Sequence, residues 1–148
     1  MPHKICYKKL ALFLSILLFV VSFSKSFAVS YEYAVTVPTE GGLGNPGDIV
    51  SYKDGYYSLS SVFQDGNMYG VIVEDASVSF EDRNLEQSKL VTSIGEVLLN
   101  VSAKNGNISE GDYVTSSDIP GVGVRASEDG QVLGIAMEGF SSENSEEI

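Results

Sequence analysis

The feature that most restricts the fold of this chain is a pattern that occurs twice at a fixed spacing. Residues 33–74 align without a gap on residues 97–138, at an offset of 64 positions. The two segments share ten identities in 42 positions, where ordinary composition predicts about three. The identities pair Val37 with Val101, Gly42 with Gly106, Gly47 with Gly111, Asp48 with Asp112, Val50 with Val114, Asp54 with Asp118, Asp65 with Asp129, Gly66 with Gly130, Gly70 with Gly134 and Glu74 with Glu138. We interpret the pattern as duplication of one unit that is too small to bury its apolar face alone.

The stretches between the shared glycines and acids have the composition of β-strands. Turn signals recur about every eight to twelve residues and separate short runs rich in Val, Ile, Tyr and Ser. These runs predict strands at Tyr31–Val37, Asp48–Tyr52, Tyr56–Phe63, Tyr69–Val73, Leu90–Val101, Asp112–Ser116, Gly123–Ala126 and Gln131–Met137. We therefore expect an all-β fold over residues 29–138, a small internally duplicated barrel or sandwich. Glu81–Ser88 is expected to be a charged surface connection, and Gly139–Ile148 an acidic flexible tail.

The first 28 residues have the pattern of an export signal. Three lysines, at positions 4, 8 and 9, precede an apolar run from Leu10 to Phe23. Ser26-Phe27-Ala28 then places small residues three and one positions before a cleavage point, as signal peptidase requires. We therefore expect a signal peptide that is cleaved after Ala28.

An uncleaved membrane anchor is the alternative interpretation of the same segment. A transmembrane helix needs roughly 20 apolar residues. Leu10–Val29 reaches that length only if Lys25 lies near the end of the helix, where a lysine can snorkel to the headgroups. In both cases the lysines stay in the cytoplasm and the β domain is exported. The domain would be membrane-anchored on the extracytoplasmic side, or secreted or periplasmic.

The exported part is strongly acidic. Residues 29–148 keep all 20 acidic residues but only five basic ones, a net charge of 5 − 20 = −15. Such a surface repels a phosphate backbone, so nucleic acid is not expected as a partner. The lone cysteine, Cys6, precedes the apolar run, so the exported part contains no disulfide. A small domain without disulfides must be stabilised by its own core, by forming a homo-oligomer or by binding a partner.

Two repeated acids are the candidate catalytic residues. Asp48 and Asp112 are equivalent in the two segments, and a pseudo-two-fold axis could bring them together as an acid/base dyad. The structural alternative is that Gly-Asp opens a strand as ordinary turn chemistry. Glu74 and Glu138 also repeat, at the ends of apolar strands, and could supply a second carboxylate pair. The favoured interpretation is that each charge protects an exposed strand edge.

Other familiar chemistries lack their residues. Ser116 and Ser117 have no histidine to activate them, because the only histidine is His3 in the targeting segment. A serine–lysine arrangement with Lys89 or Lys104 stays open, although no spacing supports it. Zinc lacks ligands, since the exported part has neither Cys nor His. The oxygen donors available to calcium are Asp65, Asn67, Glu74, Asp75, Glu81 and Asp82, which do not fit an EF-hand loop. We expect no cofactor and no metal.

Tyrosines supply the candidate binding face. Six of them lie between residues 31 and 69, namely Tyr31, Tyr33, Tyr52, Tyr56, Tyr57 and Tyr69. Exposed tyrosines on a sheet can bind sugars or a protein partner, and a half-buried sheet face also favours tyrosine. Asn100-Val101-Ser102 and Asn107-Ile108-Ser109 match the glycosylation sequon, which matters only in a eukaryotic secretory pathway.

The second segment resembles a known module. Its motifs are Ile94–Val101, Asn105–Asp112, Thr115–Ser117, Pro120-Gly121 and Gly134–Glu138. Over residues 90–138, and more loosely over 47–75, they are similar to a β-rich C-terminal module of phage tail fibres and neck appendages and of secreted bacterial surface proteins. This module resembles the peptidase G2 family of autoproteolytic, chaperone-like domains.

Two functions are consistent with the sequence. The favoured one is a non-catalytic exported β module that acts in surface or envelope assembly or in protein interaction, with a surface protein or a second copy as partner. The alternative, which the resemblance implies, is an autoproteolytic peptidase-like domain of the intramolecular chaperone type.

Overall fold

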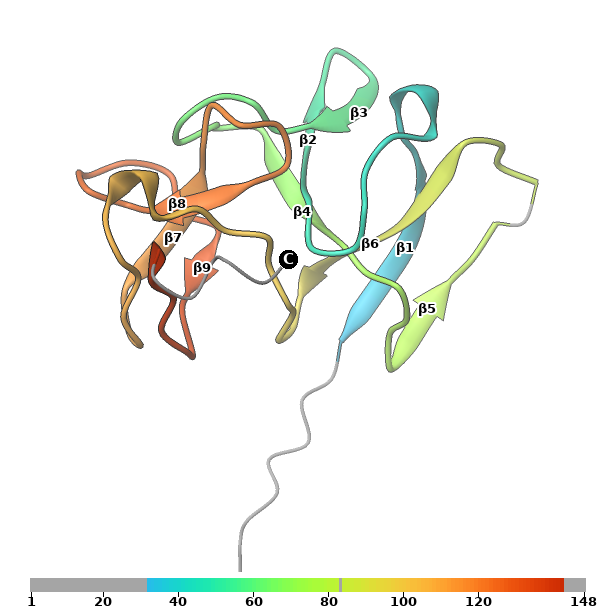
Figure 1. Cartoon of the computed structure of the whole chain (residues 1–148). Helices are drawn as coiled ribbons and strands as arrows, with labels where there is room; N and C mark the ends of the chain where they lie inside the picture. The colour runs from blue at the N-terminus through green and yellow to red at the C-terminus, as the bar shows by residue number, and fades with distance from the viewer. Residues whose placement is uncertain (1–31, 83, 143–148) are drawn as a thin grey trace, which may run out of the picture.

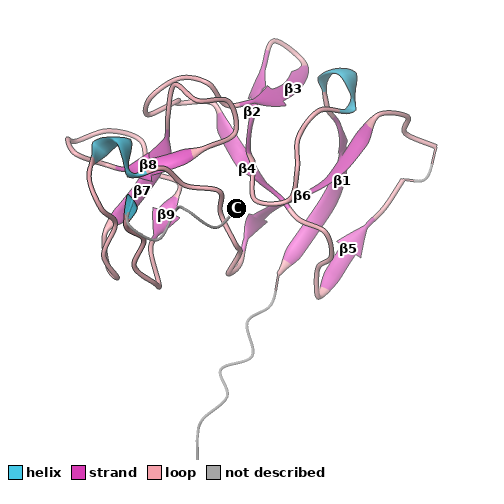
Figure 2. Cartoon of the chain, in the orientation of Figure 1, coloured by secondary structure: helices cyan, strands magenta, loops and turns pink. Residues whose placement is uncertain are grey.

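The chain is built of β-strands and turns (Figure 2) in a computed structural model that describes residues 32–82 and 84–142. The strands are β1 (Tyr33–Pro38), β2 (Ile49–Lys53), β3 (Tyr56–Leu59), β4 (Met68–Ile72), β5 (Val78–Phe80), β6 (Ser88–Ile94), β7 (Tyr113–Ser116), β8 (Gly123–Arg125) and β9 (Gly134–Ile135). Two short 3-10 turns form at Glu40–Gly42 and Ala103–Asn105, and Ser142 also has 3-10 conformation. The prediction of an all-β fold is confirmed.

The predicted N-terminal hydrophobic helix lies outside the described residues. Within residues 32–82 and 84–142, no helix is long and apolar enough to span a bilayer.

The larger sheet has six strands in the order β3-β2-β4-β6-β1-β5. It curls back on itself, because a parallel bridge joins Thr39, just after β1, to Tyr57 in β3. Its core consists of Val37, Val50, Ile72 and Val91, which are at most 4% exposed. Branched aliphatic side chains suit a pleated surface. Three consecutive residues are buried in β2 (Ile49–Ser51) and in β4 (Gly70–Ile72), so both faces of these two strands are covered there.

The smaller sheet has three strands in the order β8-β7-β9 and lies beside the larger one (Figure 1). Val114 and Val124 are buried in it. Two isolated bridges extend it, a parallel one between Val101 and Gly123 and an antiparallel one between Ile108 and Phe140. Residues 139–142, expected at the start of the tail, are therefore attached through Phe140, and residues 143–148 lie outside the described part.

The strands differ from the sequence prediction at four places. The strand predicted at Tyr56–Phe63 ends at Leu59, and the strand predicted at Gln131–Met137 is reduced to Gly134–Ile135. The strand predicted at Leu90–Val101 ends at Ile94, because Gly95 has a φ of 131°, which breaks the extended conformation. Strand β5 was not predicted, and it pairs in parallel with β1. The turn at Asp54-Gly55 joins β2 to β3, and both residues have positive φ, as a two-residue hairpin turn of type I′ requires.

Equivalent positions of the two aligned segments have the same local geometry. Val50 pairs with Gly70 in the larger sheet, and Val114 pairs with Gly134 in the smaller one. The hydrogen bonds Gly47 N–H to Ile72 O and Gly111 N–H to Ala136 O both measure 2.8 Å. The two sheets differ in what lies beyond these strands. Strand β4 also pairs with β6 on its other side, whereas β9 is an edge strand.

Candidate functional site

Asp48 lies buried at the junction of the two sheets, with 7% of its surface exposed. Its Oδ2 accepts the Asn45 backbone N–H at 2.8 Å, and its Oδ1 accepts the Asn100 side-chain amide at 2.8 Å. The same amide nitrogen of Asn100 also donates to the Pro46 carbonyl at 3.1 Å. Oδ2 of Asp48 therefore closes the turn before β2, and Oδ1 holds this turn against the segment before β7.

Backbone hydrogen bonds reinforce this junction. The Asn100 N–H donates to the Gly47 carbonyl at 2.9 Å, and the Ile49 N–H donates to the Gly121 carbonyl at 2.8 Å. Gly121 fits here because it has no side chain: a Cβ would lie 2.8 Å from the Cβ of Asp48. Sequence reasoning missed the contact between Asn100 and Asp48, because the two residues are 52 positions apart and no local pattern links them.

Asp112 is the counterpart of Asp48 in the smaller sheet, and it is partly exposed. Its Oδ2 accepts the Ser109 backbone N–H at 2.8 Å, which repeats the bond between Asn45 and Asp48. Each aspartate thus closes its own turn, and no hydrogen bond in the described residues joins the two side chains. Glu74 and Glu138, the other repeated acids, are both exposed.

The two candidate serines are buried and act as structural hydrogen-bonding groups. Ser116 Oγ donates to the Val62 carbonyl at 2.7 Å and accepts the Asp65 N–H at 2.9 Å. Ser117 Oγ donates to the Val122 carbonyl at 2.6 Å. The lysine candidates differ in position: Lys104 forms an exposed ion pair with Asp118, and Lys89 lies in β6 on the larger sheet. Through its hydrogen bonds to Val62 and Asp65, Ser116 links the loop after β3 to β7.

Asp65 is a second polar centre that the sequence marked only as a possible calcium ligand. Its Oδ2 accepts hydrogen bonds from Ser51 Oγ at 2.6 Å and Ser60 Oγ at 3.2 Å, and its Oδ1 accepts the Asn67 N–H at 2.9 Å. Partial burial alone would raise the pKa of Asp65, but these hydrogen bonds to the charged form outweigh it and lower the pKa. Among the described residues, no group of three or more His, Cys, Asp or Glu is placed to hold a metal ion.

The structure divides the predicted tyrosine face. Tyr57 packs between Tyr52 and Tyr69, with ring centroids 4.7 and 5.0 Å away. Burial first, and then the neighbouring Tyr69 and Tyr52, raise the pKa of Tyr57. Tyr57 and Tyr69 also pack on the core of the larger sheet, so this group is partly structural. Tyr56 is exposed in β3, and Tyr31 lies outside the described residues.

Tyr33 belongs to a different group, an exposed apolar surface formed by β5, β1 and β6. It pairs with Val78 on one side and with Ile94 on the other, and its ring lies 5.1 Å from that of Phe80. We call these four residues the basal patch. Their exposed fractions are 46% for Tyr33, 43% for Val78, 57% for Phe80 and 68% for Ile94. Grouped apolar side chains this exposed are typical of an interaction site.

The basal patch lies next to the buried core of the larger sheet. Val35, two residues after Tyr33 in β1, packs on the buried core of the larger sheet. β5 is an edge strand with β1 as its one neighbour, and it contains neither the lysine nor the proline that commonly protects an exposed edge. The sequence prediction missed β5 because three residues are too short a signal, although Val78-Ser79-Phe80 does alternate.

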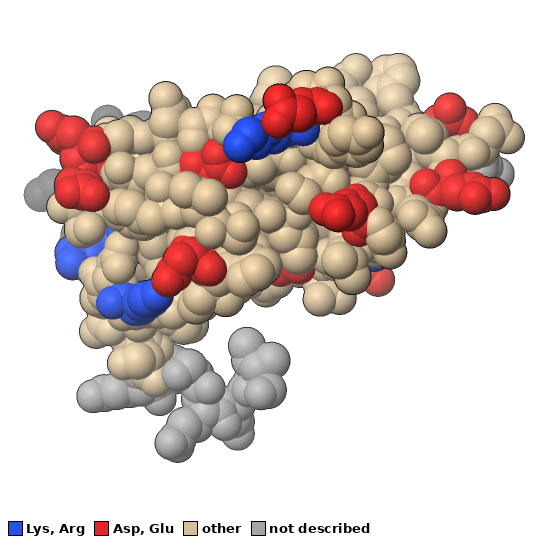
Figure 3. Space-filling model, turned by 90° about the horizontal axis from the view of Figure 1, so that it is seen from above, with Lys and Arg blue, Asp and Glu red and all other residues tan. Residues whose placement is uncertain are grey.

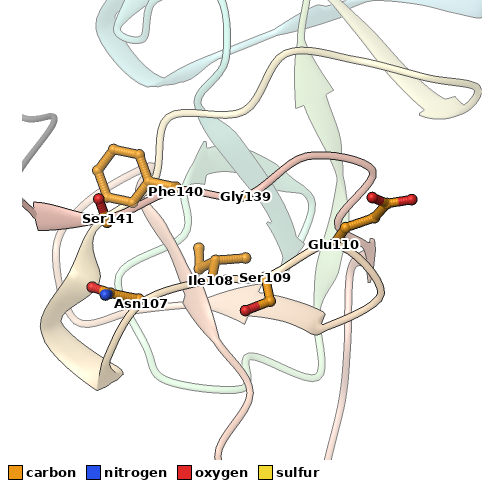
Figure 4. Close-up of a pocket in the computed structure, with 7 residues that line it drawn as sticks. All are labelled: Asn107, Ile108, Ser109, Glu110, Gly139, Phe140 and Ser141. Atoms are coloured by element: carbon orange, nitrogen blue, oxygen red, sulfur yellow. The ribbon is translucent and has the colours of Figure 1, made fainter.

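Two hollows flank Phe140 in the smaller sheet. One is lined by Asn107, Ile108, Ser109, Glu110, Gly139, Phe140 and Ser141 (Figure 4). It opens to solvent, and Glu110 projects away from Ile108 in this view. The other is lined by Val101, Ser102, Ala103, Lys104, Phe140 and Ser142. Neither brings together charged groups that would fix a substrate.

Acidic residues are spread over the surface rather than gathered in one site. Figure 3 shows them at separate places on the upper face, in two places with a basic residue alongside. This distribution gives a general negative field and no focused anionic or cationic pocket on that face.

Comparisons with family models, with curated proteins and with solved structures find no match for this chain. The resemblance of residues 90–138 to the module of phage appendages and bacterial surface proteins stays a prediction from its motifs.

Proposed function

We propose that the chain is an exported, non-catalytic β module that acts by binding, as an interaction or assembly unit of the cell surface or envelope. The basal patch is its binding surface. The observation that carries this proposal is the grouping of four exposed apolar side chains on three adjacent strands, with Tyr33 in contact with all three others through pairing or ring packing. The N-terminal pattern supports export.

The roles of the polar residues favour binding over chemistry. Asp48, Asp65, Ser116 and Ser117 each form two or more hydrogen bonds through the side chain. Asp48 and Ser116 have partners more than 50 residues away in the chain. A nucleophile or general base needs a free lone pair directed at substrate. In these residues the lone pairs accept hydrogen bonds from backbone and side-chain donors of the fold.

We also infer that the two aligned segments are copies of one β unit that have diverged. The shared register of Val50 with Gly70 and Val114 with Gly134 supports this inference, as do the matching turn bonds of Asp48 and Asp112. Duplication explains the repeated glycines and aspartates as turns of the fold. The basal patch lies partly outside the repeat, since β5 and β6 occur between the two copies.

Photo-cross-linking tests the proposed binding surface. Benzoylphenylalanine is placed at position 80 of the full chain, which is then expressed in its source cells and irradiated. Position 56 in β3 is the matched control, because Tyr56 is 75% exposed and β3 and β5 are the two opposite edges of the same sheet. We expect adducts to protein or lipid from position 80 and few from position 56. Equal yields, or none from position 80, would contradict the proposal.

A further inference from the structure

We propose that the basal patch lies against the surface of a zwitterionic lipid bilayer, next to the point at which the N-terminal apolar run crosses it. The inference rests on the proposed function and names the partner of the same surface. It takes the anchor alternative, in which Leu10–Val29 stays attached to the domain.

The length of the chain before β1 favours this position. Tyr33 is the first residue of β1 and follows Val29 by four positions. An extended chain advances at most about 3.6 Å per residue, so Tyr33 stays within roughly 14 Å of the end of the anchor. The start of β1 lies beside β5 at one end of the molecule (Figure 1). In an anchored chain this end must therefore face the membrane.

The residues exposed at this end suit an interface between water and lipid. Tyr33 and Phe80 are aromatic, and aromatic rings are enriched at the headgroup level of membranes. Val78 and Ile94 add aliphatic surface on either side of Tyr33. Leu98, which is 91% exposed, lies in the loop that follows Ile94.

Charge distinguishes a zwitterionic bilayer from the other apolar partners. Glu32 precedes Tyr33 directly, and Glu96 follows Ile94 by two positions. A second copy of the exported part would add its own excess of 15 acidic over basic residues, from 20 acidic and five basic ones, and would be repelled, as would an anionic lipid surface. Phosphatidylcholine headgroups carry no net charge and impose no such repulsion.

The size of the patch favours the same partner. A stable protein interface uses about 20 to 30 residues on each side, and the patch has four. A bilayer needs no matching shape. The anchor already keeps the domain at the membrane, so a small apolar surface acts at a high effective concentration.

The chain contains no tryptophan, so the fluorescence of a single introduced tryptophan reports the surroundings of that one residue. Phe80→Trp and Ile94→Trp place the reporter in the basal patch, and Tyr56→Trp places it at the opposite edge of the sheet. Each full-length variant is inserted into phosphatidylcholine vesicles with and without brominated acyl chains. We expect a blue-shifted emission and a loss of intensity with brominated lipid for positions 80 and 94, and neither for position 56.

Each other outcome overturns the inference. Equal quenching at all three positions means that the domain lies on lipid without a preferred face, and no quenching means that the patch stays in water. A blue shift at position 80 that grows with protein concentration and shows no quenching means that a second copy covers the patch. Cross-links from position 80 to a protein, without quenching by lipid, would keep the proposed function and reject this partner.

Discussion

The side-chain amide of Asn100 donates a 2.8 Å hydrogen bond to the buried carboxylate of Asp48, and this bond connects the two sheets of the molecule. The contact explains why a repeated acid that resembles half of a catalytic dyad is buried. Asp48 supplies one oxygen to its own turn and the other to the neighbouring sheet. Its role is to fix the two halves relative to each other.

Asp48→Ala should destabilise the fold by about 2–4 kcal/mol, because the Asn45 N–H and the Asn100 amide would both lose a buried acceptor. Asp112→Ala removes a single turn bond at a partly exposed site and should cost about 1 kcal/mol. Urea unfolding of the two variants measures both values. Equal costs would mean that Asp48 has no role beyond that of an ordinary turn residue.

Gly70 and Gly134 test how far the two segments have diverged. A Cβ on Gly70 would lie 2.2 Å from the Thr92 carbonyl oxygen, whereas a Cβ on Gly134 would have nothing within 4 Å. Gly70→Ala should therefore cost about 3 kcal/mol or more, since the backbone of β6 cannot move away freely. Gly134→Ala should change the free energy of unfolding by about 0.5 kcal/mol or less. Similar losses from both substitutions, measured by thermal unfolding, would be inconsistent with an open edge at β9.

The lowered pKa of Asp65 predicts an acid-dependent loss of stability. In the unfolded chain this carboxyl returns to its ordinary pKa of 3.8, so its contribution to stability is complete above that pH. The contribution disappears as the pH falls through the lower pKa of the folded state. Wild-type protein should lose unfolding free energy below about pH 4 more steeply than Asp65→Asn does.

Asp118 provides the control for this titration. Its pKa is also lowered, chiefly by a hydrogen bond from Lys104, but the side chain is 61% exposed and solvent screens the pair. Asp118→Asn should keep most of the wild-type pH dependence. Identical curves for wild type and Asp65→Asn in urea titrations at several pH values would show that the Asp65 hydrogen bonds add no stability.

Intact-mass analysis of native material tests both the absence of self-cleavage and the anchor. The bilayer contact requires one species that begins at Met1, and the absence of self-cleavage requires that no internal fragment forms after days of storage. A chain that begins at Val29 would reject the anchor and with it the bilayer contact of the basal patch. A time-dependent internal cleavage would favour the autoproteolytic alternative.

The sequence predicted the local features of the fold well, because they depend on neighbouring residues. The Asp54-Gly55 hairpin and the Gly47-Asp48 turn follow from glycine and aspartate chemistry within a few positions. Contacts between distant segments had no such signal. Asn100 reaches Asp48 across 52 residues, and Phe80 lies near Thr36 across 44. The basal patch is formed by pairing between strands that are distant in the sequence. Of its four residues, only Tyr33 was therefore among the predicted binding residues.

Hydrogen–deuterium exchange of the full chain on phosphatidylcholine vesicles tests most directly whether the molecule binds through the basal patch. Exchange is compared with that of the Phe80→Ser variant on the same vesicles, so that both samples carry the same N-terminal segment. We predict slower exchange in wild type at Val78–Phe80 and near Ile94, and unchanged exchange at Tyr56–Leu59. Equal exchange of the two proteins at β5 and β6, or a difference confined to β3, would contradict the proposal.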